Sequence, residues 1–237
     1  LWKPFNNDKI RQAVLYAFNQ EDFVQASVGN PKYYKLCKAL FICGMPFATD
    51  AHMDGILESN MKKARALLKE AGYDGTPIVL MHSTDLQILT NLAPVAKSLL
   101  EKAGFKVDMQ SMDWQTLVAR RSKKDAPDKG GWSAFITSWA AGDQFNPISM
   151  AFLNASCDKA IFGWPCDKQL EKLRDDFARS TDEAQQMEIV KAIQKRWREY
   201  PTHVHLGQWY SLLAHRDNVS GFLQTAGIPV LWNVEKK

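Results

Sequence analysis

Three residue types that could form a hydrolytic site stand almost together in the sequence, as His82, Ser83 and Asp85. Such a triad needs a histidine that takes the serine proton and an acid that orients the histidine, and it is recognised by positions in space. This cluster falls where a predicted strand turns into a helix, and the turn explains the residue types. No nucleophile elbow, phosphate loop, dinucleotide loop or zinc-protease motif occurs in the sequence. We therefore do not expect an enzyme.

Two other histidines, His203 and His205, alternate along a predicted strand, so that both could face one metal ion. A pair of ligands without a Cys, Asp or Glu at matching spacing makes a weak metal site. We expect structural roles for both, no metal site and no cofactor.

The four cysteines form two local pairs, Cys37 with Cys43 and Cys157 with Cys166, although the sequence alone permits three complete pairings. No CxxC unit suggests zinc. Two short-range disulfides in an oxidising compartment are favoured over reduced, buried thiols.

The composition is that of a globular protein: 237 residues, 46% of them hydrophobic and 24% charged, with a net charge of +4. The only dense basic run, residues 120–124, is followed at once by acids, so we expect no nucleic-acid partner. No apolar stretch approaches the roughly 20 residues that cross a bilayer. The sequence begins at Leu1 without a secretory signal, which we interpret as an excised piece of a longer protein.

The hydrophobic pattern alternates between helices and strands. It predicts helices over residues 8–27, 59–71 and 114–122, and a further helix that starts at residue 85 or 90 and ends at 103. It also predicts strands over 78–81, 105–109 and 134–139, and two later helices over 167–179 and 181–200, the last one capped by Thr181. Such alternation indicates an α/β fold with a largely parallel sheet. We expect a central mixed sheet of four or five strands flanked by helices.

Five segments resemble one family in order and spacing: PFNNDKIRQAV at residues 4–14, KARALL at 63–68 followed by AGY, LL at 99–100 followed by AG, VSGF at 219–222 and WNV at 232–234. They are similar to family 5 extracellular solute-binding proteins of ABC transporters, the group of oligopeptide, dipeptide and nickel binders. The resemblance implies one lobe of a two-lobed, periplasmic-binding-protein-like clamp. Residues 1–202 would form the second, C-terminal lobe, and 203–237 a segment that returns toward a first lobe missing from this chain.

In the family, solute lies between the lobes, and an Asp after a Trp-containing strand end meets the amino terminus of a peptide. Trp139, Gly142 and Asp143 are similar, with one extra residue between the Trp and the Asp. A carboxylate at a strand end can form a charge-assisted hydrogen bond with an ammonium group. The alternative is a turn-forming Asp in a glycine-containing loop.

The helix that begins at Trp114 carries Arg120, which matches an Arg that holds the peptide carboxylate in dipeptide-binding relatives. A guanidinium suits a carboxylate because it donates two parallel hydrogen bonds, but a solvated basic face is the alternative. Trp114 and Trp139 could line the cleft or belong to the core. The resemblance also favours the pair Cys157–Cys166, because dipeptide-binding relatives carry a disulfide loop in this stretch.

The function that the resemblance implies is the solute-binding component of an ABC importer in the periplasm. Its expected partners are a small solute, with a peptide favoured, the missing first lobe and an inner-membrane ABC permease. Two alternatives remain: an α/β enzyme of small molecules with its site in the loop 139–147, and a sensor or scaffold lobe that no longer serves transport.

Overall fold

The computed structural model describes residues 2–223 and 230–237 of the chain. Its α-helices are α1 (Asp8–Ala17), α2 (Gln20–Ser27), α3 (Met61–Glu70), α4 (Gln87–Thr90), α5 (Leu92–Ala103), α6 (Trp114–Arg121), α7 (Lys168–Arg179) and α8 (Glu183–Glu199). Its strands are β1 (Tyr34–Lys35), β2 (Ile78–Ser83), β3 (Val107–Met112), β4 (Ala134–Phe135), β5 (Gln208–Trp209), β6 (Val219–Ser220) and β7 (Glu235–Lys236).

The central sheet consists of three parallel strands in the order β3-β2-β4. Every residue of β2 is buried, because this middle strand is covered on both faces. Helices α4 and α5 connect β2 to β3, whereas α6 leads from β3 back past β2 to β4. Right-handed crossovers place α5 and α6 on opposite faces of the sheet, and both helices pack against β2.

The predicted α/β class is confirmed, with differences in the sheets. The central sheet has three strands instead of four or five, and β4 is shorter than predicted, since the chain leaves the sheet after Phe135. Antiparallel pairing occurs in two separate short sheets, β1 with β5 and β6 with β7. The central sheet is therefore purely parallel, and the antiparallel strand pairs lie in the two small sheets outside it.

Capping side chains set the helix boundaries that the hydrophobic pattern misplaced. The predicted helix over residues 8–27 is broken at Phe18, because Asn19 is extended and its side chain accepts a hydrogen bond from the Glu21 N–H to start α2. Helix α8 is capped by Asp182, whose side chain accepts from the Gln185 N–H, and not by Thr181. Helix α5 ends as predicted at Gly104, which has a φ of 103° that suits glycine.

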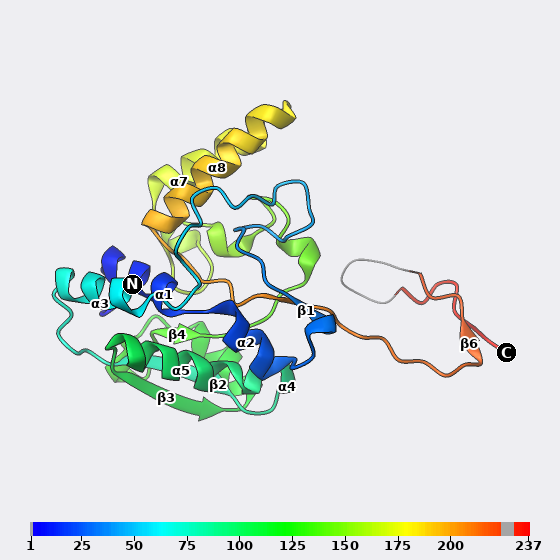
Figure 1. Cartoon of the computed structure of the whole chain (residues 1–237), viewed down its shortest axis with the longest axis horizontal. Helices are drawn as coiled ribbons and strands as arrows, with labels where there is room; N and C mark the ends of the chain where they lie inside the picture. Colours follow the sequence, from blue (N-terminus) through cyan, green and yellow to red (C-terminus); the bar gives the residue numbers. More distant parts are fainter. Residues whose placement is uncertain (1, 224–229) are drawn as a thin grey trace.

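The helices form two groups around the core. Helices α1, α2, α3 and α5 pack side by side next to the sheet, and α7 pairs with α8 in a hairpin that projects from the body (Figure 1). The fully buried Trp197 of α8 anchors this hairpin in the core. After β5 the chain runs out of the body as an extended arm that carries β6 and β7 (Figure 1). None of the helices in the described residues has the length and apolar character needed to cross a membrane.

Candidate functional site

The carboxyl ends of the parallel strands define the edge of the sheet where solutes usually bind in open α/β folds. Strand β2 ends at Ser83, and β3 ends just before α6. The Asp85 carboxylate joins these two ends, because it accepts hydrogen bonds from the Ser83 hydroxyl (3.1 Å) and from the Trp114 N–H (2.8 Å). Asp85 thus fixes the start of α6 relative to β2.

The imidazole of His82 does not take part in a triad. Its Nδ1 lies 2.9 Å from the Ser111 hydroxyl and its Nε2 lies 2.8 Å from the Thr90 carbonyl oxygen. Both ring nitrogens are therefore used between β3 and α4, while the Ser83 hydroxyl donates to Asp85. These contacts agree with the interpretation of this cluster as a turn.

Asp143 lies on an exposed turn that follows β4. The short 3-10 helix Ala141–Asp143 is closed by two backbone hydrogen bonds, from the Asp143 N–H to the Ala140 oxygen (3.1 Å) and from the Gln144 N–H to the Ala141 oxygen (3.0 Å). Within the described residues, the Asp143 carboxylate has no hydrogen bond and no ion-pair partner. The two interpretations of Asp143 are therefore compatible. Its backbone forms the turn, and its carboxylate makes no hydrogen bond within the described residues.

The neighbouring Trp139 is 41% exposed. Its ring packs edge-on against Phe152, with 5.1 Å between the ring centres, and Phe152 in turn lies 5.6 Å from the His203 ring. The structure therefore brings Trp139, Gly142 and Asp143 together on one exposed segment, whose Trp139 packs on the partly buried ring of Phe152, next to that of His203.

Arg120 is engaged inside the protein. Its guanidinium donates to the carbonyl oxygens of Gly130 (3.0 Å) and Gly131 (2.6 Å) and to the Gln110 side chain (2.6 Å). These bonds tie α6 to β3 and to the loop before β4. A solute carboxylate could use this guanidinium only by replacing some of them.

Arg121, which sequence reasoning did not single out for binding, has a different environment. Its guanidinium lies over the rings of Phe162 (4.5 Å), Trp114 (5.6 Å) and Phe135 (5.9 Å). Its Nε is buried without a hydrogen-bond partner, and burial lowers the pKa of the group. Among the residues that the structure describes, no carboxylate pairs with Arg121. The sequence signal for Arg121 was its place directly after Arg120. The sequence does not show that the two side chains have different surroundings, which only the folded structure reveals.

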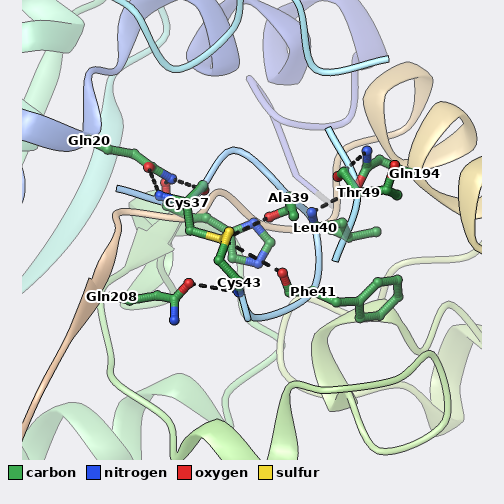
Figure 2. The surroundings of a disulfide bond; sticks show 10 residues. Gln20, Cys37, Ala39, Leu40, Phe41, Cys43, Thr49, Gln194 and Gln208 are labelled. Carbon is green, nitrogen blue, oxygen red and sulfur yellow. Dashed lines mark hydrogen bonds between the residues drawn. A yellow bond between two sulfur atoms is a disulfide. The ribbon is translucent and has the colours of Figure 1, made fainter. Parts of the chain in front are cut away.

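Both predicted disulfides are present, Cys37–Cys43 and Cys157–Cys166. The second closes the loop that carries Phe162, the ring nearest to Arg121. The first closes a loop that enters the core, as Figure 2 shows. The two short-range pairs that the cysteine spacing favoured are thus the ones that form.

His203 and His205 do not lie on a strand, because β5 begins only at Gln208. Their rings meet edge to face with 4.8 Å between centres, and both lie 5.8 Å from the Trp197 ring. Burial lowers the pKa of His205 to about 4, and burial together with the charge of His205 lowers the pKa of His203 well below its usual value. No group of three or more potential ligand side chains in residues 2–223 and 230–237 could hold a metal ion.

Residues 2–161 match the family described as bacterial extracellular solute-binding proteins, family 5 Middle. The chain belongs to this family. The match covers the sheet, helices α1 to α6 and the Asp143 turn. Membership indicates an extracytoplasmic protein, and the predicted family is confirmed.

Individual members of family 5 agree with this assignment. The chain is 33% identical to the probable peptide ABC transporter periplasmic-binding protein y4tO of Sinorhizobium fredii over 237 residues, which are 100% of this chain and 44% of the relative. It is 26% identical to di/tripeptide-binding protein 2 of Pseudomonas aeruginosa, over 93% of this chain and 41% of the relative. The chain therefore spans less than half the length of these curated relatives.

Solved structures of binding proteins share the fold. A Helicobacter pylori periplasmic binding protein, DppA, in complex with the peptide STSA gives a TM-score of 0.75 at 20% identity, over 99% of this chain and 45% of that one. The protein AgaA from Agrobacterium tumefaciens R10, in complex with agropinic acid, gives 0.75 at 21% identity, over 99% and 48%. These identities establish the fold alone, that of about half of such a binding protein.

Proposed function

We propose that this chain is the second lobe of a periplasmic solute-binding protein that captures a peptide and delivers it to an inner-membrane ABC permease. Family membership supports a binding role, and the names of the two curated relatives favour a peptide. The observation that carries the proposal is the free, exposed carboxylate of Asp143, beside the exposed Trp139 and after the carboxyl end of β4. A carboxylate in this position suits an ammonium group.

The opposite end of the peptide would meet a guanidinium. Arg121 supports this role better than Arg120, because its charge is unpaired and partly desolvated while the donors of Arg120 are occupied. Trp114, whose ring lies next to the Arg121 guanidinium, would supply apolar contact on the same side.

The first lobe of the same protein is the second proposed partner. We assign residues 1–202 to the lobe and 203–237 to the segment that leads toward the first lobe, with residues up to β5 still packed on the body. Beyond β5 the arm exposes large apolar side chains, including Leu212 (65% exposed) and Trp232 (89% exposed). Such surface is normally covered by another protein surface. The two disulfides suit the oxidising periplasm.

Calorimetry and thermal-shift assays on the full-length protein test the proposal, with di- and oligopeptides, sugars, opines and nickel as ligands and this chain alone in parallel. We expect peptides to bind the full-length protein and to leave the single lobe silent, because half of the contacts are missing from it. Tight binding by the single lobe would contradict the clamp. Turnover of a ligand that Asp143→Ala abolishes would favour the enzyme alternative, and a full-length protein that binds none of these solutes would favour a sensor or scaffold.

A further inference from the structure

The Cys37–Cys43 disulfide closes a loop that behaves as part of the core. Its residues Ala39, Leu40 and Phe41 are 4%, 1% and 0% exposed. Connecting loops usually run over the surface, because buried backbone groups need partners. This loop therefore needs a special set of hydrogen bonds.

Three glutamine side chains from distant elements supply these bonds (Figure 2). Gln20 of α2 accepts from the Cys37 N–H (2.8 Å) and donates to the Cys37 oxygen (2.7 Å). Gln194 of α8 accepts from the Leu40 N–H (2.8 Å), and Gln208 of β5 accepts from the Cys43 N–H (2.9 Å). The loop is thereby fixed to three separate parts of the lobe.

One backbone bond leads from this loop to the Asp143 turn. The Ile42 N–H donates to the Gln144 carbonyl oxygen at 3.3 Å. Among the residues that the structure describes, this is the only hydrogen bond that joins segment 139–145 to a part of the chain distant in sequence. Ile42 lies directly beside Cys43, so the disulfide limits the freedom of the donor.

We propose that the Cys37–Cys43 disulfide is a positioning element of the solute site, which holds the Asp143 turn through Ile42. The inference rests on the proposed role of Asp143. Apart from the packing of Trp139 on Phe152, this turn has one external hydrogen bond, so it would sample other positions when that support is loose, and ordering it on binding would weaken affinity. A disulfide that serves stability alone would lower the melting temperature and leave the turn and the affinity unchanged.

The test compares Cys37→Ser/Cys43→Ser with Cys157→Ser/Cys166→Ser in the full-length protein. Amide hydrogen exchange at Ile42 is measured without solute, and the dissociation constant for a peptide is measured below the melting transition. We expect the first variant to exchange the Ile42 amide at least about tenfold faster and to bind about tenfold more weakly, while the second keeps Ile42 protected. Unchanged Ile42 exchange or unchanged affinity in the first variant would overturn the proposal.

Ile42→Pro covers the case in which the first double variant does not fold. Proline removes the N–H that donates to Gln144, while it also fixes the φ of residue 42, and both cysteines stay in place. We expect about tenfold weaker peptide binding with the disulfide intact, and unchanged affinity would again reject the inference. If the wild-type protein binds no peptide, the proposed function fails, whereas the exchange at Ile42 still decides whether the disulfide holds the turn.

Discussion

The Arg121 guanidinium lies 4.5 Å from the centre of the Phe162 ring, in the loop closed by the Cys157–Cys166 disulfide. Burial lowers the pKa of this group, and within the described part of the chain no carboxylate compensates its charge. Aromatic faces stabilise a cation, but less than a hydrogen-bonded carboxylate does. The lobe therefore holds a cation whose best partner would be an external anion.

Replacing Arg121 with Met should weaken binding of peptides that have a free carboxyl terminus by at least about tenfold. The melting temperature should stay the same or rise, because an unpaired, partly desolvated charge is replaced by an apolar chain of similar length. Calorimetry and thermal denaturation of the full-length protein measure both effects.

Arg120→Met is the matched control on the same helix. Its guanidinium makes three internal hydrogen bonds, so this variant should lose several degrees of melting temperature and keep most of the affinity. Stronger loss of affinity in Arg120→Met than in Arg121→Met would reverse the assignment of the two arginines.

Replacing Asp143 with Asn should reduce the affinity for peptides with a free amino terminus by roughly ten- to a hundredfold, the range for a hydrogen bond to a charged group. The stability should not change, because the carboxylate is exposed and has no hydrogen-bond partner among the described residues. Titration calorimetry with a free and an N-acetylated peptide separates the amino-terminal contact from the rest. Asp128→Asn, another exposed carboxylate, should bind like the wild type. Equal affinity of Asp143→Asn and wild type would remove Asp143 from the site.

The fold class and the disulfides could be predicted because local signals determine them. Apolar spacing placed α5 and Gly104 ended it, and the short separation within each cysteine pair favoured a disulfide across its own loop. The break at Phe18 and the cap at Asp182 were missed because apolar periodicity does not show which of several polar residues caps a helix.

The site could be predicted only in part. The motif around Trp139 and Asp143 is continuous in sequence, so it stays together in the fold. The difference between Arg120 and Arg121 depends on Gly130, Gly131 and Phe162, which approach α6 only after folding. The link from Ile42 to Gln144 likewise joins segments about a hundred residues apart, and no local pattern announces it.

Acid should destabilise the lobe through His205. Its pKa is about 4 in the folded protein against 6.5 for an ordinary histidine, so the unfolded state binds the proton more readily. Stability is therefore complete above pH 6.5 and is lost as the pH falls toward 4. His205→Leu should reduce this loss by roughly 2 kcal/mol at pH 4.5, judged by urea unfolding at pH 7.5 and 4.5. The control is His215→Leu at an exposed position, and its stability should depend on pH as in the wild type. If the stability of His205→Leu also depends on pH as in the wild type, burial of His205 does not cause the loss of stability in acid.

Substitution of Gln194 should lower the free energy of unfolding more than substitution of most other polar residues of the lobe. Gln194 is 0% exposed, and its amide accepts from the Leu40 N–H (2.8 Å) and donates to the carbonyl oxygens of Thr49 (2.9 Å) and Ala51. Gln194→Leu keeps the size of the side chain but leaves these buried backbone groups without partners, at a cost of about 2–4 kcal/mol in the free energy of unfolding. Urea denaturation measures the change, and the exposed Gln169→Leu should stay within about 0.5 kcal/mol of wild type. If Gln194→Leu is as stable as the wild type, the loop closed by Cys37–Cys43 finds other hydrogen-bond partners. Gln194 would then not be what holds this loop to α8.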